Sequence, residues 1–260
     1  MGIYFDIIRF NFLRFLAYPL EIWAAIIKRV INVGFLVVFW SIVARSSQGT
    51  INFVPLISYF LISSSVNDVI SAEAQRFGKY IGDLVKHGAF NTYLIRPLSL
   101  IPYLYSSCLG ERSLSLILSA IIFILGIIIS PPSGVLSVAL FIVFLSLAVV
   151  ISLSINLMVG ILHFYTPEAS NFRYTISHVI KVFSGAIVPL SFFPDSFRWI
   201  VQLSPFPGMV YAPVTSLHIT SLSPAVWQSL AVNAAWAVVL LAIAVMWWKK
   251  AIKHYDAVGI

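Results

Sequence analysis

Long apolar runs alternate with short polar segments along this chain, and most of them approach the roughly 20 residues that a membrane-spanning helix needs. These runs predict an all-α membrane protein with six transmembrane helices in a single domain, residues 1–260. The predicted spans cover residues 22–44, 53–70, 114–129, 135–162, 172–190 and 226–248. The third lies within a longer apolar run, 101–129, whose early turns carry Glu111 and Arg112.

The most polar stretch of the chain, residues 70–99, lies between the second and third predicted spans. It has to lie in water on one membrane face, and its excess of Lys and Arg indicates the cytoplasmic face. Residues 72–86 predict a short helix, because charged side chains recur there at intervals of three and four residues. The side chains that we single out are Glu73, Arg76, Lys79, Asp83 and Lys86. This helix is either a solvated element at the membrane surface or a docking element for a partner protein.

Two further segments have patterns that differ from a transmembrane helix. Residues 1–19 combine aromatic side chains with Asp6, Arg9 and Arg14. They predict an amphipathic helix in the membrane interface, although they also suit a frayed start of the first span. Residues 191–224 are apolar, but their prolines exclude one continuous helix. A pair of short re-entrant helices in the outer leaflet, between the fifth and sixth spans, fits both properties.

Composition supports these predictions and sets the orientation. Hydrophobic residues make up 60% of the chain and charged residues only 10%, whereas a soluble domain has about 25% charged residues. The net charge is +7, and the positive residues gather on the side of the polar stretch. Only Arg45 and Arg198 fall on the opposite side. The positive-inside rule therefore predicts that both termini are cytoplasmic.

No catalytic or metal site is predicted. The five His residues are dispersed, and the single cysteine, Cys108, excludes a cysteine-based metal site. The chain has no glycine-rich phosphate loop, so we do not expect it to bind ATP itself. Lys181 lies within the fifth predicted span with His178 one turn before it, and this pair is a possible intramembrane polar site. Alternatively, Lys181 extends to the membrane surface or pairs with Glu168.

Several motifs are similar to those of a known family. The pattern G-x-x-x-x-x-L-x-R-P-x-S spans residues 88–99, with Arg96, Pro97 and Ser99 in place. A second pattern, in which P-x-x-x-F-P is followed by P-F, spans residues 189–206, and the ending YDAVG spans residues 255–259. Together these motifs resemble the integral-membrane permease subunits of type-2 ABC exporters, in a subgroup whose substrates are uncharacterised.

This resemblance implies a multi-pass export permease in the bacterial inner (plasma) membrane. In the family, two permease subunits pair, as a homodimer or a heterodimer, and a separate ATPase subunit that binds ATP and Mg²⁺ drives each of them. The resemblance places the ATPase-coupling helix at residues 72–88, within a cytoplasmic coupling loop at residues 71–100. The competing interpretations are a non-transporting membrane scaffold or assembly factor and a secondary transporter. The secondary transporter is disfavoured, because its spans should carry buried carboxylates or broken helices.

Overall fold

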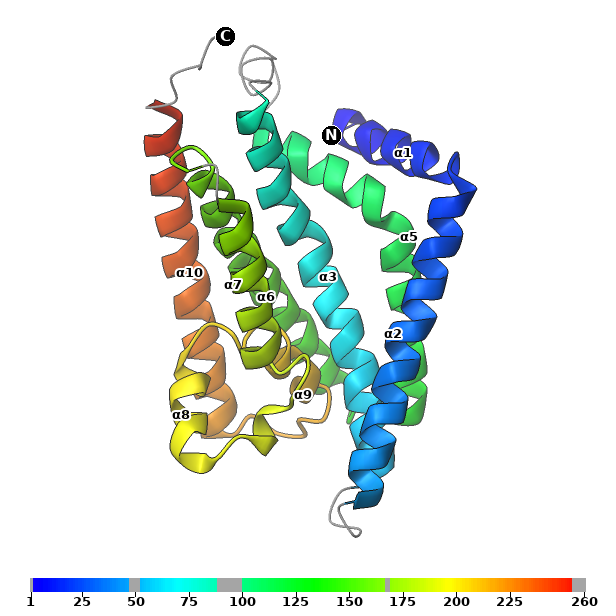
Figure 1. Ribbon diagram of the computed structural model, residues 1–260. Helices are drawn as coiled ribbons and strands as arrows, with labels where there is room; N and C mark the ends of the chain where they lie inside the picture. Colours follow the sequence, from blue (N-terminus) through cyan, green and yellow to red (C-terminus); the bar gives the residue numbers. More distant parts are fainter. Residues whose placement is uncertain (1, 47–51, 88–99, 167–168, 254–260) are drawn as a thin grey trace.

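A computed structural model describes residues 2–46, 52–87, 100–166 and 169–253, and the regular structure within these ranges is helical. Apart from one short 3-10 turn, the elements are α-helices (Figure 1). In chain order they are α1 (Gly2–Leu16), α2 (Pro19–Ser46), α3 (Phe53–Lys86), α5 (Leu100–Ile129), α6 (Val135–Leu162), α7 (Ala169–Phe183), η1 (Leu190–Phe192), α8 (Asp195–Leu203), α9 (Tyr211–Ser216) and α10 (Pro224–Lys253).

Within the described residues, five helices are long and apolar enough to cross a membrane, as judged by length and composition. They are α2, the Phe53–Ile70 part of α3, α5, α6 and α10. The fourth predicted span coincides with α6, Val135–Leu162, and is confirmed. The all-helical fold with several apolar helices is confirmed as well, whereas a sixth span is not found on these criteria.

The fifth predicted span, residues 172–190, is wrong as one helix. The observed helix, α7, ends at Phe183 and has 15 residues, which gives a length of about 22 Å. The hydrocarbon core of a bilayer is about 30 Å thick, so α7 alone is too short to cross it. Gly185 ends the helix, because its φ of 85° lies in the left-handed region that favours glycine.

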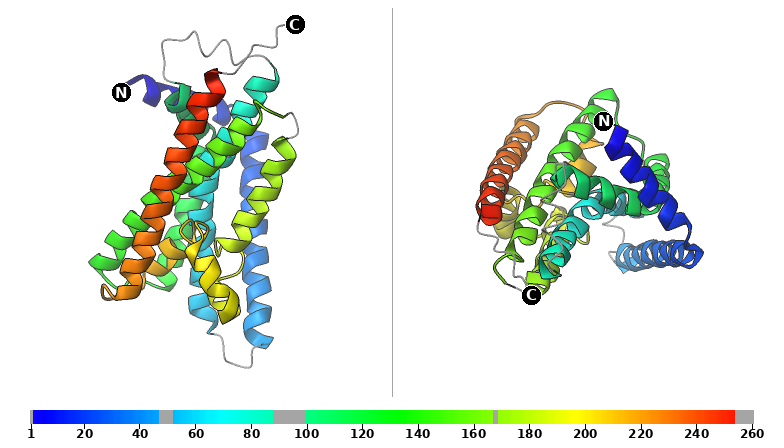
Figure 2. Two further views of the ribbon diagram at one scale, coloured as in Figure 1. Left: turned by 90° about the vertical axis from the view of Figure 1, so that its left-hand side faces the viewer. Right: turned by 90° about the horizontal axis from the view of Figure 1, so that it is seen from above.

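The long helices run alternately up and down, so that α2 begins and α10 finishes at the same end of the molecule (Figures 1 and 2). We call this end the α1 end, because α1 lies across it at a steep angle to α2. We call the opposite end, where α8 lies, the α8 end. The first turns of α5 run beside α1 before the helix bends along the bundle (Figure 1). Gly110 permits this approach: a Cβ there would lie only 2.5 Å from the Ile8 carbonyl oxygen.

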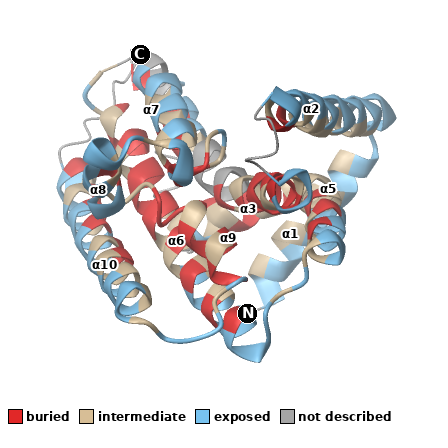
Figure 3. Ribbon diagram, turned by 90° about the horizontal axis from the view of Figure 1, so that it is seen from below, coloured by how far each residue is buried: buried red, intermediate tan, exposed pale blue. Residues whose placement is uncertain are grey.

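Helix α3 forms the centre of the bundle, and α2 stands at its side (Figure 3). More than half of the Phe53–Ile70 segment, 56%, is buried, whereas none of the best apolar window of α2 is. Ile62, Val66 and Ile70 of α3 pack against Ile151 of α6 and Val214 of α9 in the main core. The exposed apolar surface of α2 suits contact with lipid or with another protein.

Helix α3 does not end where the sequence predicts an exit into water. It continues from Phe53 to Lys86, 34 residues, without a break between the predicted second span and the predicted helix 72–86. The expectation of a separate short helix is therefore wrong, although its predicted C-terminus is right: the helix is capped by His87. Asp68, close to the end of the predicted second span, contacts α2 and α5.

Candidate functional site

The α1-end half of α3 packs directly on the end of α6 through two glycines one turn apart. A Cβ at Gly78 would lie 2.8 Å from the backbone oxygen of Asn156, and a Cβ at Gly82 would lie 2.5 Å from the ring of His163. Gly160 of α6 faces Gly78 at similarly close range. Small residues spaced four apart allow helix backbones to approach closely, which is a common way for helices to associate in membranes.

Apolar side chains fill the space around this glycine contact. Ile81 and Leu84 of α3 are buried with Leu157 and Ile161 of α6, and Trp248 of α10 completes the same cluster. The α1-end half of α3 is therefore joined to both α6 and α10. A displacement of this half would be transmitted to those helices, because tightly packed elements move together.

The His163 imidazole closes this contact beyond the end of α6. The residue is only 8% exposed, and its Nδ1 lies 3.2 Å from the Val159 carbonyl oxygen. Burial lowers the pKa of His163 below its ordinary value of 6.5, and the nearby positive charge of Arg173 acts in the same direction, while the two backbone hydrogen bonds and Asp83 oppose the shift. The neutral form is therefore favoured in the folded protein.

Opposite this buried side, α3 presents charge. The side chains of Lys79 and Asp83 are exposed, one turn apart, while Ile81 and Leu84 face the core. The exposed His87 ring follows them, and its Nδ1 lies 2.8 Å from the Asp83 carbonyl oxygen. A helix with one charged and one buried side is thus present where the sequence places the coupling helix.

The other residues predicted for this region are not placed by the structure. Three of them, Glu73, Arg76 and Lys86, belong to α3, but their side chains lie outside what the structure describes. The motif residues Arg96, Pro97 and Ser99 lie outside the described residues altogether. Their roles stay predictions.

A buried polar cluster that the sequence analysis missed lies midway along α3. The Arg29 guanidinium of α2 forms a salt bridge with Asp68 of α3, and both side chains are largely buried. The Ser119 hydroxyl of α5 donates a 2.6 Å hydrogen bond to the same carboxylate. This cluster joins three long helices, and two of its members carry charge that is costly to bury alone. In the sequence, Arg29 and Asp68 each resemble an ordinary charged residue near the end of a span. They are recognised as a buried pair only because the fold brings them together across about 40 residues of sequence.

The proposed intramembrane pair does not form a combined site in the described part of the chain. His178 is exposed on α7, and its Nδ1 lies 2.7 Å from the Tyr174 carbonyl oxygen. Lys181 is partly exposed in the last turn of α7 and makes no ion pair with a described residue. Glu168, the alternative partner of Lys181, lies outside the described residues.

At the α8 end, the proline-containing segment folds into short helices that are tied to the bundle. Arg198 of α8 donates hydrogen bonds to the carbonyl oxygens of Leu190, Ser191 and Phe193, and it pairs with Asp195 at 2.8 Å. The segment is also bonded to its surroundings through the backbone: the Tyr211 amide donates to the Ser184 carbonyl oxygen at 2.9 Å. The short helices predicted for residues 191–224 are therefore present, as α8 and α9.

The described residues contain no group of three or more His, Cys, Asp or Glu side chains that is arranged to hold a metal ion. The fold and the packing define a polytopic helical membrane protein, whose α1 end joins a charged helix to the spanning bundle. The family model described as "ABC-2 family transporter protein" matches residues 50–259, most of the chain. The protein therefore belongs to the ABC-2 transporter family. A search of the curated proteins found no match.

Proposed function

We propose that this chain is a permease subunit of an ATP-driven export system, which pairs with a second permease subunit and is driven by a separate ATPase. The family match supports a permease role and an ABC ATPase as partner. The observation that carries the proposal further is the continuity of α3. One helix of about 51 Å links an exposed charged segment to the centre of the apolar bundle.

The energy of ATP hydrolysis would enter through the α1-end half of α3. The exposed side that includes Lys79 and Asp83 would dock on the ATPase, and the glycine contact with α6 would carry the resulting displacement into the bundle. The translocation path would lie between two permease subunits. The exposed apolar surface of α2 is available for such pairing or for lipid.

In this proposal the α1 end is cytoplasmic, in a bacterial plasma membrane. Both termini would then be cytoplasmic, α1 would lie in the membrane interface, and α8 and α9 would dip into the outer leaflet as re-entrant helices. Helix α7, together with the residues that follow it, would form the fifth of the six crossings. Two single-cysteine variants in a Cys108→Ser background, Lys79→Cys and Thr220→Cys, test the orientation. A membrane-impermeant maleimide added to intact cells should label only Thr220→Cys, and the reverse pattern would overturn this orientation.

The docking proposal is tested by a triple variant, Glu73→Ala/Arg76→Ala/Asp83→Ala. Affinity purification of the tagged chain from the cells that naturally produce it should recover an ATPase together with the original protein. With the triple variant, the amount of ATPase recovered should be at least tenfold lower. Membrane insertion should be unchanged, because these changes lie outside the five apolar segments. The control is Lys249→Ala, which removes an exposed charge from α10 at the same end of the molecule.

Two outcomes would contradict different parts of the proposal. Full ATPase recovery with the triple variant would show that the subunits dock elsewhere. Failure to recover any ATPase with the original protein would favour the non-transporting scaffold and would overturn the proposed function itself.

A further inference from the structure

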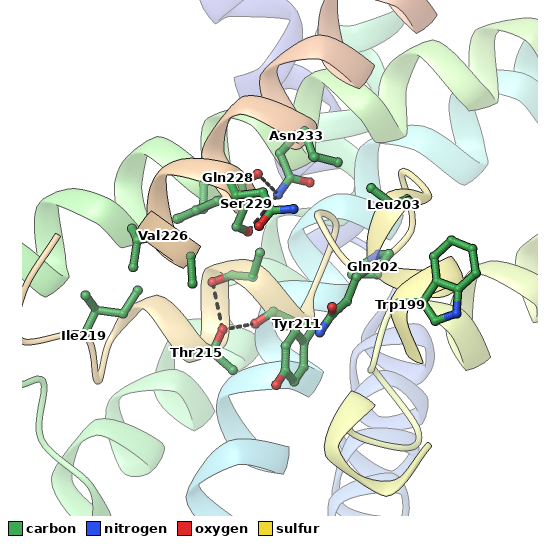
Figure 4. A pocket seen from close by; sticks show the side chains of 15 residues that line it. Trp199, Gln202, Leu203, Tyr211, Thr215, Ile219, Val226, Gln228, Ser229 and Asn233 are labelled. Carbon is green, nitrogen blue, oxygen red and sulfur yellow. Dashed lines mark hydrogen bonds between the residues drawn. The ribbon is translucent and has the colours of Figure 1, made fainter. Parts of the chain in front are cut away.

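A pocket of about 440 Å³ lies at the α8 end between α8, α9 and the first turns of α10 (Figure 4), and Phe144 of α6 also contributes to its lining. Its volume lies within the roughly 300–1,000 Å³ that is usual for small-molecule sites. The pocket is formed by a single chain, and it is remote from both the charged end of α3 and the Arg29–Asp68 pair. The proposed coupling mechanism therefore does not use it.

The walls of this pocket are held in place by specific contacts. The Trp236 indole of α10 donates a 2.7 Å hydrogen bond to the Leu203 carbonyl oxygen at the end of α8. Gly208, before α9, lies so close to Asn233 of α10 that a Cβ there would overlap the Asn233 amide oxygen. The Asn233 side chain is buried and donates to the Ser229 carbonyl oxygen at 2.8 Å. These contacts join the three helices that surround the cavity.

The lining is mostly apolar and carries no charged residue. Two side-chain amides, Gln202 of α8 and Gln228 of α10, line it from different walls (Figure 4). Both amides are exposed, and within the described residues they make no hydrogen bond to protein, whereas Thr215 is satisfied by carbonyl oxygens of its own helix. Apolar side chains, among them Trp199 and Val226, provide most of the remaining surface.

We propose that this pocket binds an uncharged amphiphile whose head group carries several hydroxyl groups, of the kind found in a neutral glycolipid. The amides of Gln202 and Gln228 donate to and accept from hydroxyl groups, and the apolar wall receives the start of an alkyl chain. A purely apolar occupant would displace water from both amides without replacing its hydrogen bonds, and this desolvation is costly. A charged head group would find no opposite charge in the lining to compensate its desolvation.

Photolabelling tests this proposal on the full-length chain, purified without any ATPase, in phosphatidylcholine nanodiscs. The probe is a glucosyl diacylglycerol with a diazirine next to the ester group of one acyl chain. Peptides that contain residues 199–203 and 225–233 should be labelled. Unlabelled glucosyl diacylglycerol should compete at least tenfold better than phosphatidylglycerol with the same acyl chains. Equal competition by the two lipids, or label spread evenly over the apolar helices, would overturn the proposal.

A second competitor distinguishes a membrane lipid from a soluble amphiphile as the source of this head group. Octyl glucoside, used below its micellar concentration, carries the same sugar on one short chain. Competition by both glucosides assigns the site to the shared head-group chemistry. Competition by the diacylglycerol alone assigns it to a membrane lipid, because the second acyl chain is then required.

Variants separate binding from folding. The double change Gln202→Leu/Gln228→Leu should reduce labelling about tenfold by removing both amides. Gln228→Asn keeps an amide and should retain more label than Gln228→Leu. The matched control is Thr220→Val, which alters an exposed polar residue of the α8 end outside the pocket lining. Size-exclusion profiles confirm folding, and unchanged labelling in a monodisperse double variant would refute the assignment. None of these outcomes depends on transport, so they leave the proposed function to be tested separately.

Discussion

In the half of α3 nearer the α8 end, Phe53–Ile70, serine hydroxyls contact backbone oxygens of neighbouring elements, whereas in the half nearer the α1 end glycines bring backbones together. Ser58 donates to the Gly126 carbonyl oxygen of α5 at 2.9 Å, and Ser63 donates to the Ala186 carbonyl oxygen at 3.3 Å. In the other half, Gly78 meets the backbone of α6 at Asn156, and Gly82 meets the His163 ring just beyond the end of α6.

The difference follows from what each half has to achieve. An apolar environment supplies little hydrophobic driving force between helices, so association depends on close packing and on hydrogen bonds. Hydroxyl contacts tie the Phe53–Ile70 half to several partners at once. Glycine contacts fix the other half against one partner and leave its opposite side free to display charge. The Arg29–Asp68 pair lies where the two halves meet, and it links both to α2.

The largest effect is expected at this junction. Asp68→Leu leaves the Arg29 guanidinium without its counter-charge, and breaking a buried ion pair in this way costs about 3–5 kcal/mol. The double change Arg29→Met/Asp68→Leu removes both charges, and it should recover most of that loss. Thermal stability of the detergent-solubilised protein, followed by size-exclusion chromatography, measures both effects. A double variant that is no more stable than Asp68→Leu would show that the pairing itself is not what stabilises the junction.

The next largest effect is expected at the glycine contact. Gly78→Val places methyl groups against the backbone of Asn156. Backbone atoms cannot move aside by changing a rotamer, and overpacking of this kind lowers the free energy of unfolding by about 1–3 kcal/mol. If α3 couples to an ATPase as proposed, coupling should fall as well, because the α1-end half would move away from α6. Gly34→Val on α2 is the matched control, since nothing lies within 4 Å of a Cβ there. Equal stability of the two variants would contradict the assigned close approach.

Much of the fold is predictable from the sequence, because long apolar helices depend on local composition. Helix α6 was predicted to the residue, since Gly134 and His163 flank an uninterrupted apolar run. The end of α7 was missed, although Gly185 and Pro189 are a recognisable stop signal. The break predicted after Ile70 is wrong, because α3 continues to Lys86 as one helix with Ile81 and Leu84 on its buried side and Lys79 and Asp83 on its exposed side.

A smaller effect is expected from the hydroxyl contacts in the Phe53–Ile70 half. Ser58→Ala removes a buried hydrogen bond between α3 and α5, and such bonds within membrane proteins contribute about 0.6 kcal/mol on average. The control is Ser146→Ala on α6, because that exposed hydroxyl bonds only to its own helix. The melting temperature should fall by about 1–2 °C for Ser58→Ala and stay unchanged for the control. A loss as large as that of Gly78→Val would mean that both halves of α3 depend on single contacts.

The candidate site was less predictable than the fold. Sequence spacing indicates that charged side chains recur along one side of a helix at residues 72–86, and in the structure Lys79 and Asp83 are exposed while Ile81 and Leu84 are buried. The four-residue spacing of Gly78 and Gly82 indicates that another helix can approach closely. The sequence does not indicate that this helix is α6. Pairs such as Arg29 and Asp68, or Gln202 and Gln228, are brought together only by tertiary packing. No local sequence pattern predicts these pairs.

The smallest expected effect is a pH dependence of stability that arises from His163. This residue contacts Gly82 in the α1-end half of α3. Because burial lowers the pKa of His163, the unfolded chain binds a proton more readily than the folded protein does. Stability should therefore decrease as the pH falls below about 6.5, the ordinary pKa of histidine, and the decrease should level off below the lowered pKa of the folded state. His163→Gln should flatten this part of the pH profile, whereas His178→Gln, which changes an exposed ring on α7, should leave it unchanged. The slopes of stability against pH are compared between pH 5 and pH 8. A loss of stability from altered packing against Gly82 that is the same at every pH would not change these slopes. Identical slopes in the His163→Gln variant and the original protein would show that this contact does not titrate with folding.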